Sequence, residues 1–181
     1  MPAKPPETLT VERYPSPIDG LWLAVDEAGV LRMLHFDRAE EDFLHSVARS
    51  YPKAQLVKGR VPSSVRAHLD AYFAGDLAAL ARIPTGAVGS DFQRSVWAEL
   101  KAIPHGETRS YGALARKLGK PDASRAVGLA NGSNPIAVVV PCHRVIGADG
   151  SLTGFGGGLP RKKWLLEHEG AHFVPPTGRL L

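Results

Sequence analysis

The chain contains one cysteine, Cys142, and its neighbours are of the types that make a thiol reactive. Pro141 fixes the backbone just ahead of the thiol, and His143 and Arg144 follow it. A proton acceptor or a positive charge beside a thiol lowers its pKa and raises the fraction of thiolate, which is the nucleophile. Because adjacent residues of an extended segment point to opposite faces, His143 needs a local turn or a bridging water to reach the sulfur. The Cys142-His143 dipeptide favours a nucleophilic thiol but does not establish one.

A single cysteine also limits the chemistry of the chain. It excludes an internal disulfide framework and any zinc site built on several cysteines. The seven histidines show no metal-ligand spacing, so we expect no metal. The alternative interpretation of Cys142 is a small buried hydrophobic side chain without a chemical role.

The first half of the chain shows the pattern of a small α+β domain and contains no chemical motif. Residues 8–14 alternate between polar and apolar types, which predicts a strand. Residues 21–26 and 30–36 are apolar runs separated by a short turn, which predicts an antiparallel hairpin. Helical spacing of apolar residues predicts helices around 43–48 and at 63–74.

The second half is expected to be mainly helical. An apolar stripe predicts a helix over 92–103, capped by the preceding polar residues. Short helices at 111–118 and 124–131 flank a turn and resemble a helix-turn-helix. The unbroken apolar run 136–140 leads to the thiol and is expected to be buried, and a last helix is expected at 159–168.

These patterns predict an α+β fold in two domains. The N-terminal α/β domain with antiparallel strands spans 1–85, the mainly helical domain with the helix-turn-helix spans 86–174, and a tail follows at 175–181. A segment at 75–89, rich in glycine and proline, is expected to link the domains.

The net charge of +4 is unevenly spread along the chain. The first 89 residues carry 10 Lys/Arg and 11 Asp/Glu, whereas the rest carry 12 and 7. The positive second half suits an anionic partner such as nucleic acid, although an excess of this size also simply aids solubility. No apolar run approaches the about 20 residues of a membrane span, and no signal-peptide pattern stands at the N-terminus. We expect a cytoplasmic protein, nuclear in a cell with a nucleus, and no membrane partner.

The longer string Pro141-Cys142-His143-Arg144-Val145 resembles the signature of the O6-alkylguanine-DNA alkyltransferases, also called methylated-DNA–protein-cysteine methyltransferases. The resemblance covers nearly all of residues 90–170, in segments 92–97, 106–118, 125–128, 134–135, 156–159 and 164–170. It implies direct-reversal DNA repair, in which a damaged guanine, and by extension an O4-alkylthymine, is flipped out of the duplex and its alkyl group moves onto the cysteine. The partner is then double-stranded DNA carrying alkylated bases, no cofactor is needed, and each molecule acts once. Nothing in the sequence indicates a stable oligomer, so we expect a monomer.

The resemblance implies roles for the residues around the thiol. Cys142 is the nucleophile, and His143 acts on it through a water. Glu169 orients and charges the imidazole, as in a nucleophile–base–orienter relay. Asn134 joins the hydrogen-bond network and braces the turn before the active site. Without the resemblance, Glu169 would be a solvated helix end and Asn134 a turn residue.

A second group of residues is implied to contact DNA. Arg125, at the start of the second short helix, would enter the base stack and fill the gap left by the flipped nucleotide, with its helix in the minor groove. Ala126 and Gly128 are small enough to let sugars and phosphates approach. Tyr111 would donate to guanine N3, and Ser110 would contact phosphate. Otherwise Arg125 is an ordinary surface residue and Tyr111 a core aromatic.

The guanine pocket is implied to be lined by Tyr111, Val145, Gly154, Phe155, Gly156 and Gly157. Backbone N–H groups of the loop 153–158 would bind the O6 region, and the carbonyls of Cys142 and Val145 would accept from the exocyclic amine. Phe155 stands where tyrosine often sits in the family, and Gly156 where serine can sit. The loss of these hydroxyls and the run of glycines suggest a pocket that accepts adducts larger than methyl.

Three other functions stay open at this point. Alkyltransferase-like lesion sensors share the scaffold but replace the cysteine, so Cys142 argues against them. A Cys-His hydrolase or acyltransferase would need an oxyanion hole and a distant histidine, and it leaves the helix-turn-helix unexplained. A transcription regulator would leave Cys142 as a structural residue.

Overall fold

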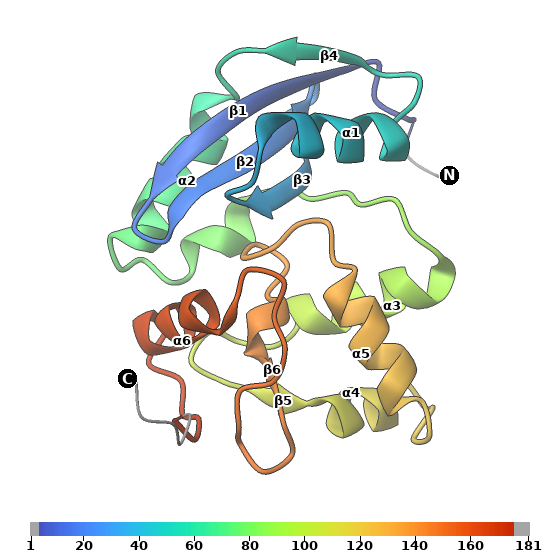
Figure 1. Cartoon of the computed structure of the whole chain (residues 1–181), viewed down its shortest axis with the longest axis vertical. Coiled ribbons are helices and arrows are strands. Elements are labelled where there is room, and N and C mark those ends of the chain that lie inside the picture. The colour runs from blue at the N-terminus through green and yellow to red at the C-terminus, as the bar shows by residue number, and fades with distance from the viewer. Residues whose placement is uncertain (1–3, 176–181) are drawn as a thin grey trace. The chain divides into compact units, whose positions relative to one another are not determined.

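The computed structural model describes residues 4–175 (Figure 1), so the predicted tail at 175–181 lies almost wholly outside the described residues. Backbone contacts divide the chain into two compact units. The first unit contains the chain up to Val88 together with Pro135–Val139, and the second contains Gly89–Asn134 and the chain from Val140 onward. The two units are described separately below.

The first unit is built on a four-stranded sheet with the order β3-β2-β1-β4. Strand β1 (Thr8–Ser16) pairs antiparallel with β2 (Asp19–Asp26), and β2 pairs antiparallel with β3 (Leu31–Phe36), which confirms the predicted antiparallel strands. Strand β4 (Gln55–Lys58) runs parallel to β1 at the sheet edge. The sequence pattern did not predict β4, because a short and largely exposed edge strand has little apolar alternation to detect.

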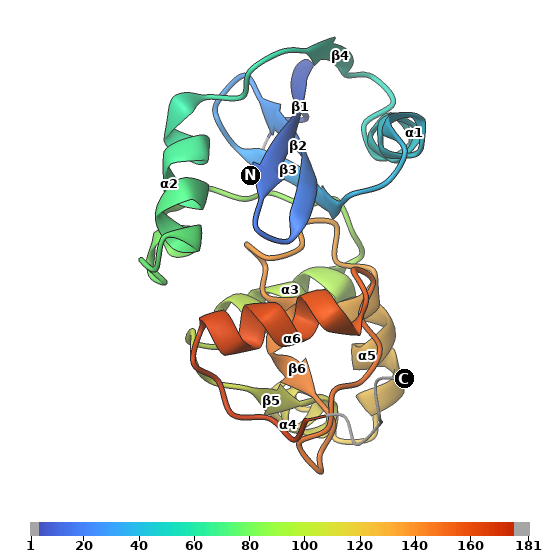
Figure 2. The same ribbon diagram turned by 60° about the vertical axis from the view of Figure 1, so that its left-hand side comes forward.

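Two helices cover the two faces of this sheet (Figure 2). Helix α1 (Glu40–Ser50) packs Phe43 and Val47 against side chains of β1, β2 and β3. Helix α2 (Ser63–Phe73) buries an apolar face of its own. A 3-10 helix η1 (Ala79–Arg82) then buries its first two residues, so this part of the segment 75–89 belongs to the core of the first unit and is not a free linker.

The apolar run before the thiol belongs to the first unit rather than to the predicted second domain. The backbone N–H of Leu34 in β3 donates to the Pro135 carbonyl at 2.9 Å, and the N–H of Ala137 donates to the Leu34 carbonyl at 3.1 Å. The run is buried, as predicted, because it satisfies the outer edge of β3. Within it, the β-branched Val138 has a left-handed φ of 68°, a conformation that costs on the order of 1–3 kcal/mol.

The second unit begins with helix α3 (Asp91–Lys101). Ser90 and Gln93 form a reciprocal capping box at its N-terminus, which is the strongest local signal for a helix start. Helices α4 (Tyr111–Lys117) and α5 (Ser124–Gly132) follow and pack against each other, as expected of a helix-turn-helix.

The remaining elements of this unit surround the thiol. A two-stranded parallel sheet joins β5 (Arg109–Ser110) to β6 (Val145–Ile146), and the 3-10 helix η2 (Cys142–Arg144) precedes β6 directly. Helix α6 (Leu159–His168) packs on η2. Among the described residues, no helix is both long enough and apolar enough to cross a bilayer.

Candidate active site

Cys142 opens the short helix η2 and is only 6% exposed. Burial raises the pKa of its thiol, and a hydrogen bond with Asn134 and the charge of Lys162 only partly oppose this effect. The expectation that the adjacent His143 and Arg144 hold the thiol pKa low is therefore wrong for the resting protein. Desolvation dominates, because the thiolate loses more hydration than its neighbours replace. The thiol must be deprotonated at the moment it reacts.

Asn134 braces the backbone just before the thiol. Its side-chain Nδ2 donates to the carbonyl oxygen of Val140 at 2.7 Å, and its side chain also bonds with the Cys142 thiol. The side-chain amide of Asn134 therefore links the segment after helix α5 both to the backbone of Val140 and to the sulfur of Cys142. The structure brings Asn134 and Cys142 into direct contact.

His143 and Glu169 form a fully buried pair, with His143 Nε2 and Glu169 Oε1 2.9 Å apart. Glu169 lies immediately after α6, and its carboxylate can only accept, so the proton of a neutral imidazole sits on Nε2. Burial lowers the pKa of His143 against the raising effect of Glu169. The ring is therefore neutral at pH 7, and its Nδ1 is an unprotonated base. Within residues 4–175 this buried Nδ1 has no hydrogen-bond partner.

Arg144 forms a two-point ion pair with Glu169 that the sequence did not indicate. Its Nε donates to Glu169 Oε2 at 2.9 Å and its Nη2 to Glu169 Oε1 at 2.8 Å, while Nη1 donates to the carbonyl of Ile103 at 2.7 Å. Burial alone would raise the pKa of Glu169, but the charges and hydrogen bonds of His143 and Arg144 outweigh it and hold the pKa well below its ordinary value. Glu169 is therefore ionised at neutral pH, and it is buried rather than a solvated helix end. The signal that could have revealed this pairing is an arginine in an apolar segment without acidic neighbours, because a buried arginine needs a carboxylate partner.

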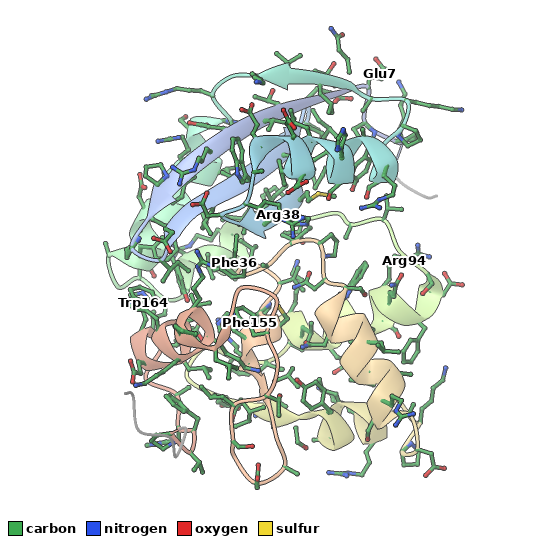
Figure 3. All side chains as sticks on the ribbon, in the orientation of Figure 1. Glu7, Phe36, Arg38, Arg94, Phe155 and Trp164 are labelled. Atoms are coloured by element: carbon green, nitrogen blue, oxygen red, sulfur yellow. The ribbon has the colours of Figure 1, made fainter. Side chains whose placement is uncertain are left out.

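The loop between β6 and α6 carries four of the predicted pocket residues, among them Phe155 (Figure 3), whereas Tyr111 begins α4 and Val145 lies in β6. Gly154 and Gly156 are exposed, and a Cβ at either position would meet no atom within 4 Å. Gly157 is buried. The hydroxyl of Tyr111 bonds that of Thr153 at 2.8 Å, which brings the start of α4 against this loop.

Helix α5 carries three of the predicted DNA-binding residues, and the start of α4 carries the other two. Arg125 and Ala126 are exposed, and Gly128 lies against the Tyr111 ring, where a Cβ would come within 3.7 Å of the ring carbons. Ser110 caps α4 by accepting from the N–H of Ala113 at 3.1 Å, which leaves its hydroxyl proton to donate. Arg125, Gly128 and Tyr111 thus belong to one surface of the helix-turn-helix.

The structure adds Lys162 to the site. It lies on α6 and is fully buried, and its Nζ donates to the carbonyls of Val145 at 2.6 Å and Thr153 at 3.3 Å. Its position on the face shared with Leu165 and Leu166 could have drawn attention to it, because a lysine rarely occupies the apolar face of a helix. In the described part of the chain, no group of three or more His, Cys, Asp or Glu side chains is arranged to hold a metal ion.

The chain is similar to known proteins in both sequence and fold. Residues 91–171 match the model of the 6-O-methylguanine DNA methyltransferase DNA-binding domain. The methylated-DNA–protein-cysteine methyltransferase of Shigella flexneri is 44% identical over 164 residues, which cover 90% of this chain and 96% of that protein.

Solved structures give the same result. The crystal structure of the O6-methylguanine methyltransferase of Mycobacterium tuberculosis superposes with a TM-score of 0.73 at 44% identity, over 90% of this chain and 93% of that one. The same organism's protein in complex with DNA superposes with a TM-score of 0.72 at 42% identity, over 89% and 92% of the two chains. With this identity over almost the full length of its relatives, the chain belongs to the methylated-DNA–protein-cysteine methyltransferase family.

Proposed function

We propose that this protein repairs DNA by moving the alkyl group of an O6-alkylguanine onto the sulfur of Cys142. The observation that carries the proposal is the buried His143–Glu169 pair directly after the only thiol of the chain, with an unprotonated His143 Nδ1. Displacement at a saturated carbon needs a soft nucleophile, and a thiolate is one. A neutral imidazole backed by a fixed carboxylate is the base that would generate it.

The proposed reaction moves the alkyl group to the sulfur and the thiol proton to the base. The thiol proton passes to His143 Nδ1 through a water, and the positive charge of the imidazolium is offset by Glu169. The thiolate attacks the alkyl carbon, the S–C bond forms and the C–O6 bond breaks. The electron pair leaves on guanine, which takes a proton at N3 from the hydroxyl of Tyr111. The imidazolium proton then restores that hydroxyl, so the thiol proton ends on the repaired base. The same displacement serves O4-alkylthymine.

The product explains why each molecule would act once. Cys142 becomes a thioether, which is stable, and the chain has no second cysteine to take the group away. The proposal also includes action as a monomer on double-stranded DNA, in the cytoplasm or in the nucleus of a cell that has one.

The test is to mix the protein with a duplex that carries O6-methylguanine labelled in its methyl group and to follow the label by peptide mass. The expected result is one labelled methyl group on the peptide that contains Cys142. Tight binding without transfer would identify a lesion sensor instead. Label on any other peptide would contradict the assignment of Cys142.

Arg125 is proposed to fill the base stack after the damaged nucleotide has left it, and this gives a selective prediction. Arg125→Ala should slow repair in duplex DNA about 10- to 100-fold, because flipping a base costs a few kcal/mol that the side chain no longer offsets. Reaction with the free O6-alkylguanine base should stay within about twofold of the original rate, since nothing then has to be flipped.

The control for this experiment is Lys163→Ala, which removes an exposed positive charge from α6. It should leave both rates nearly unchanged. Equal slowing of the duplex and free-base reactions by Arg125→Ala would reject the stacking role.

The open space at Gly154 and Gly156 supports transfer of groups larger than methyl. We expect benzyl transfer from O6-benzylguanine at a rate comparable to methyl transfer, and we expect Gly156→Ser to reduce the benzyl rate more than the methyl rate. The measurement is a single-turnover rate for each adduct. Poor benzyl transfer by the unaltered protein would refute the expectation.

A further inference from the structure

The buried lysine of helix α6 has no role in the reaction as described so far. Lys162 is fully buried, and within residues 4–175 no carboxylate pairs with it. The other buried residues of the helix, Leu165 and Leu166, lie three and four positions later and therefore on the same face. An apolar side chain would be the ordinary occupant of this position, and an unpaired buried charge is destabilising. The position of Lys162 therefore calls for a functional explanation.

The ammonium group connects two walls of the predicted guanine pocket. Its Nζ donates to the carbonyl of Val145 at 2.6 Å, and to the carbonyl of Thr153, at the start of the glycine-rich loop, at 3.3 Å. It also lies 5.9 Å from the centre of the Phe155 ring. Lys162 therefore joins the two segments through its hydrogen bonds.

The charges around Lys162 leave one partner for it. Helix η2, which carries Cys142, His143 and Arg144, packs against α6, and Glu169 follows α6 directly. Glu169 is already held by His143 and by the guanidinium fork of Arg144. A thiolate at Cys142 is therefore the negative charge that can balance the ammonium.

The mutual effect of the two groups is visible in their pKa values. Burial lowers the pKa of Lys162 to about 8, and the negative charge of Cys142 opposes that shift. In turn, burial raises the pKa of Cys142, and the positive charge of Lys162 opposes that increase. Each group favours the charged form of the other.

We propose that Lys162 is a positioning residue for alkyl transfer, one that holds the Val145 and Thr153 carbonyls at the pocket and stabilises the Cys142 thiolate by its charge. The pocket part of this inference rests on the proposed function. The thiolate part does not, because it concerns the sulfur before any DNA or base is bound.

The thiolate part has a second consequence. When the sulfur becomes a thioether it can no longer form a thiolate, so the ammonium loses the described group that could balance its charge. Alkylation of Cys142 should therefore lower the pKa of Lys162 further. The proton lost from the lysine passes to solvent.

The experiment measures the rate at which iodoacetamide alkylates Cys142 as a function of pH, with no DNA or alkylguanine present. In Lys162→Met, the rate at pH 7 should fall about 10-fold or more, since one unit in the thiol pKa is a tenfold change in thiolate. The rate should recover at high pH. The control Lys163→Met, at the exposed neighbouring position, should match the unaltered protein.

Superimposable pH profiles for folded Lys162→Met and the unaltered protein would overturn the proposal, whereas a merely structural lysine would change stability without moving the profile. If Lys162→Met does not fold, the pKa of the lysine ammonium is measured by NMR in the unaltered protein before and after S-methylation. A decrease supports the proposal, and an unchanged pKa overturns it. Failure of DNA repair with a positive thiol result would reject the proposed function alone.

Discussion

Replacing Cys142 with serine is expected to abolish alkyl transfer, with a loss of more than about 10³-fold in rate. The hydroxyl is nearly the size of the thiol but is a much harder and far less acidic group, so the same base does not generate a useful nucleophile. Because the sulfur is buried and the proposed DNA contacts come from helix α5, the affinity for duplex DNA carrying O6-methylguanine should stay within about twofold of that of the unaltered protein.

The two measurements for this variant are label transfer from methylated duplex DNA and a binding titration with the same duplex. Cys142→Ala is the matched control, since it removes the polar atom altogether and should give the same two results. Residual transfer in either variant would mean that another side chain receives the alkyl group. A large loss of binding would mean that the substitution had altered the fold near helix α5.

Replacing Glu169 with glutamine is expected to cost about 3–5 kcal/mol of unfolding free energy, the usual effect of removing one partner from a buried ion pair. The Arg144 guanidinium would stay buried without its carboxylate, and His143 would lose the acceptor that sets its tautomer. Urea unfolding at pH 7 measures this loss. Glu167→Gln, an exposed position on the same helix turn, is the control and should change stability by less than about 0.5 kcal/mol.

The loss of unfolding free energy in Glu169→Gln should depend on pH in one direction. The pKa of Glu169 is lowered in the folded protein, so its carboxylate contributes stability that is fully present above the ordinary value of 4.5. That contribution disappears as the pH falls below this value and the carboxylate is protonated. The difference in unfolding free energy between the unaltered protein and Glu169→Gln should therefore be constant near neutral pH and shrink in acid. A difference that grows in acid would contradict the pairing.

The same substitution should slow alkyl transfer about 10²-fold or more, since a glutamine cannot offset the positive charge that His143 acquires when it takes the thiol proton. The rate is compared at a temperature where the variant is folded, as judged by circular dichroism. Affinity for DNA should change little, because Glu169 is buried and does not reach the surface. An unchanged transfer rate in the folded variant would remove Glu169 from the relay.

Most helices of the second unit and the hairpin of the first unit were predictable from local sequence. The stripes of α3 and α6, the short helices α4 and α5 and the hairpin of β2 and β3 agree with their periodicities to within a few residues. Proline and glycine stops, and the capping box at Ser90, act within a few residues of chain, so they leave a local signal. The edge strand β4 and the attachment of Pro135–Val139 to β3 depend on distant partners and leave no such signal.

By itself the sequence determined which group can act as nucleophile, because Cys142 is the only thiol in the chain, and it pointed to the residues that would serve it. Only the tertiary structure decided how the charges are distributed. Arg144 follows the thiol in sequence but is bonded to Glu169, while Lys162, far along the chain, is the cation whose charge acts on the sulfur. The physical reason is desolvation. A pKa depends on which groups are buried together, and that is settled by packing between segments distant in sequence rather than by neighbours along the chain.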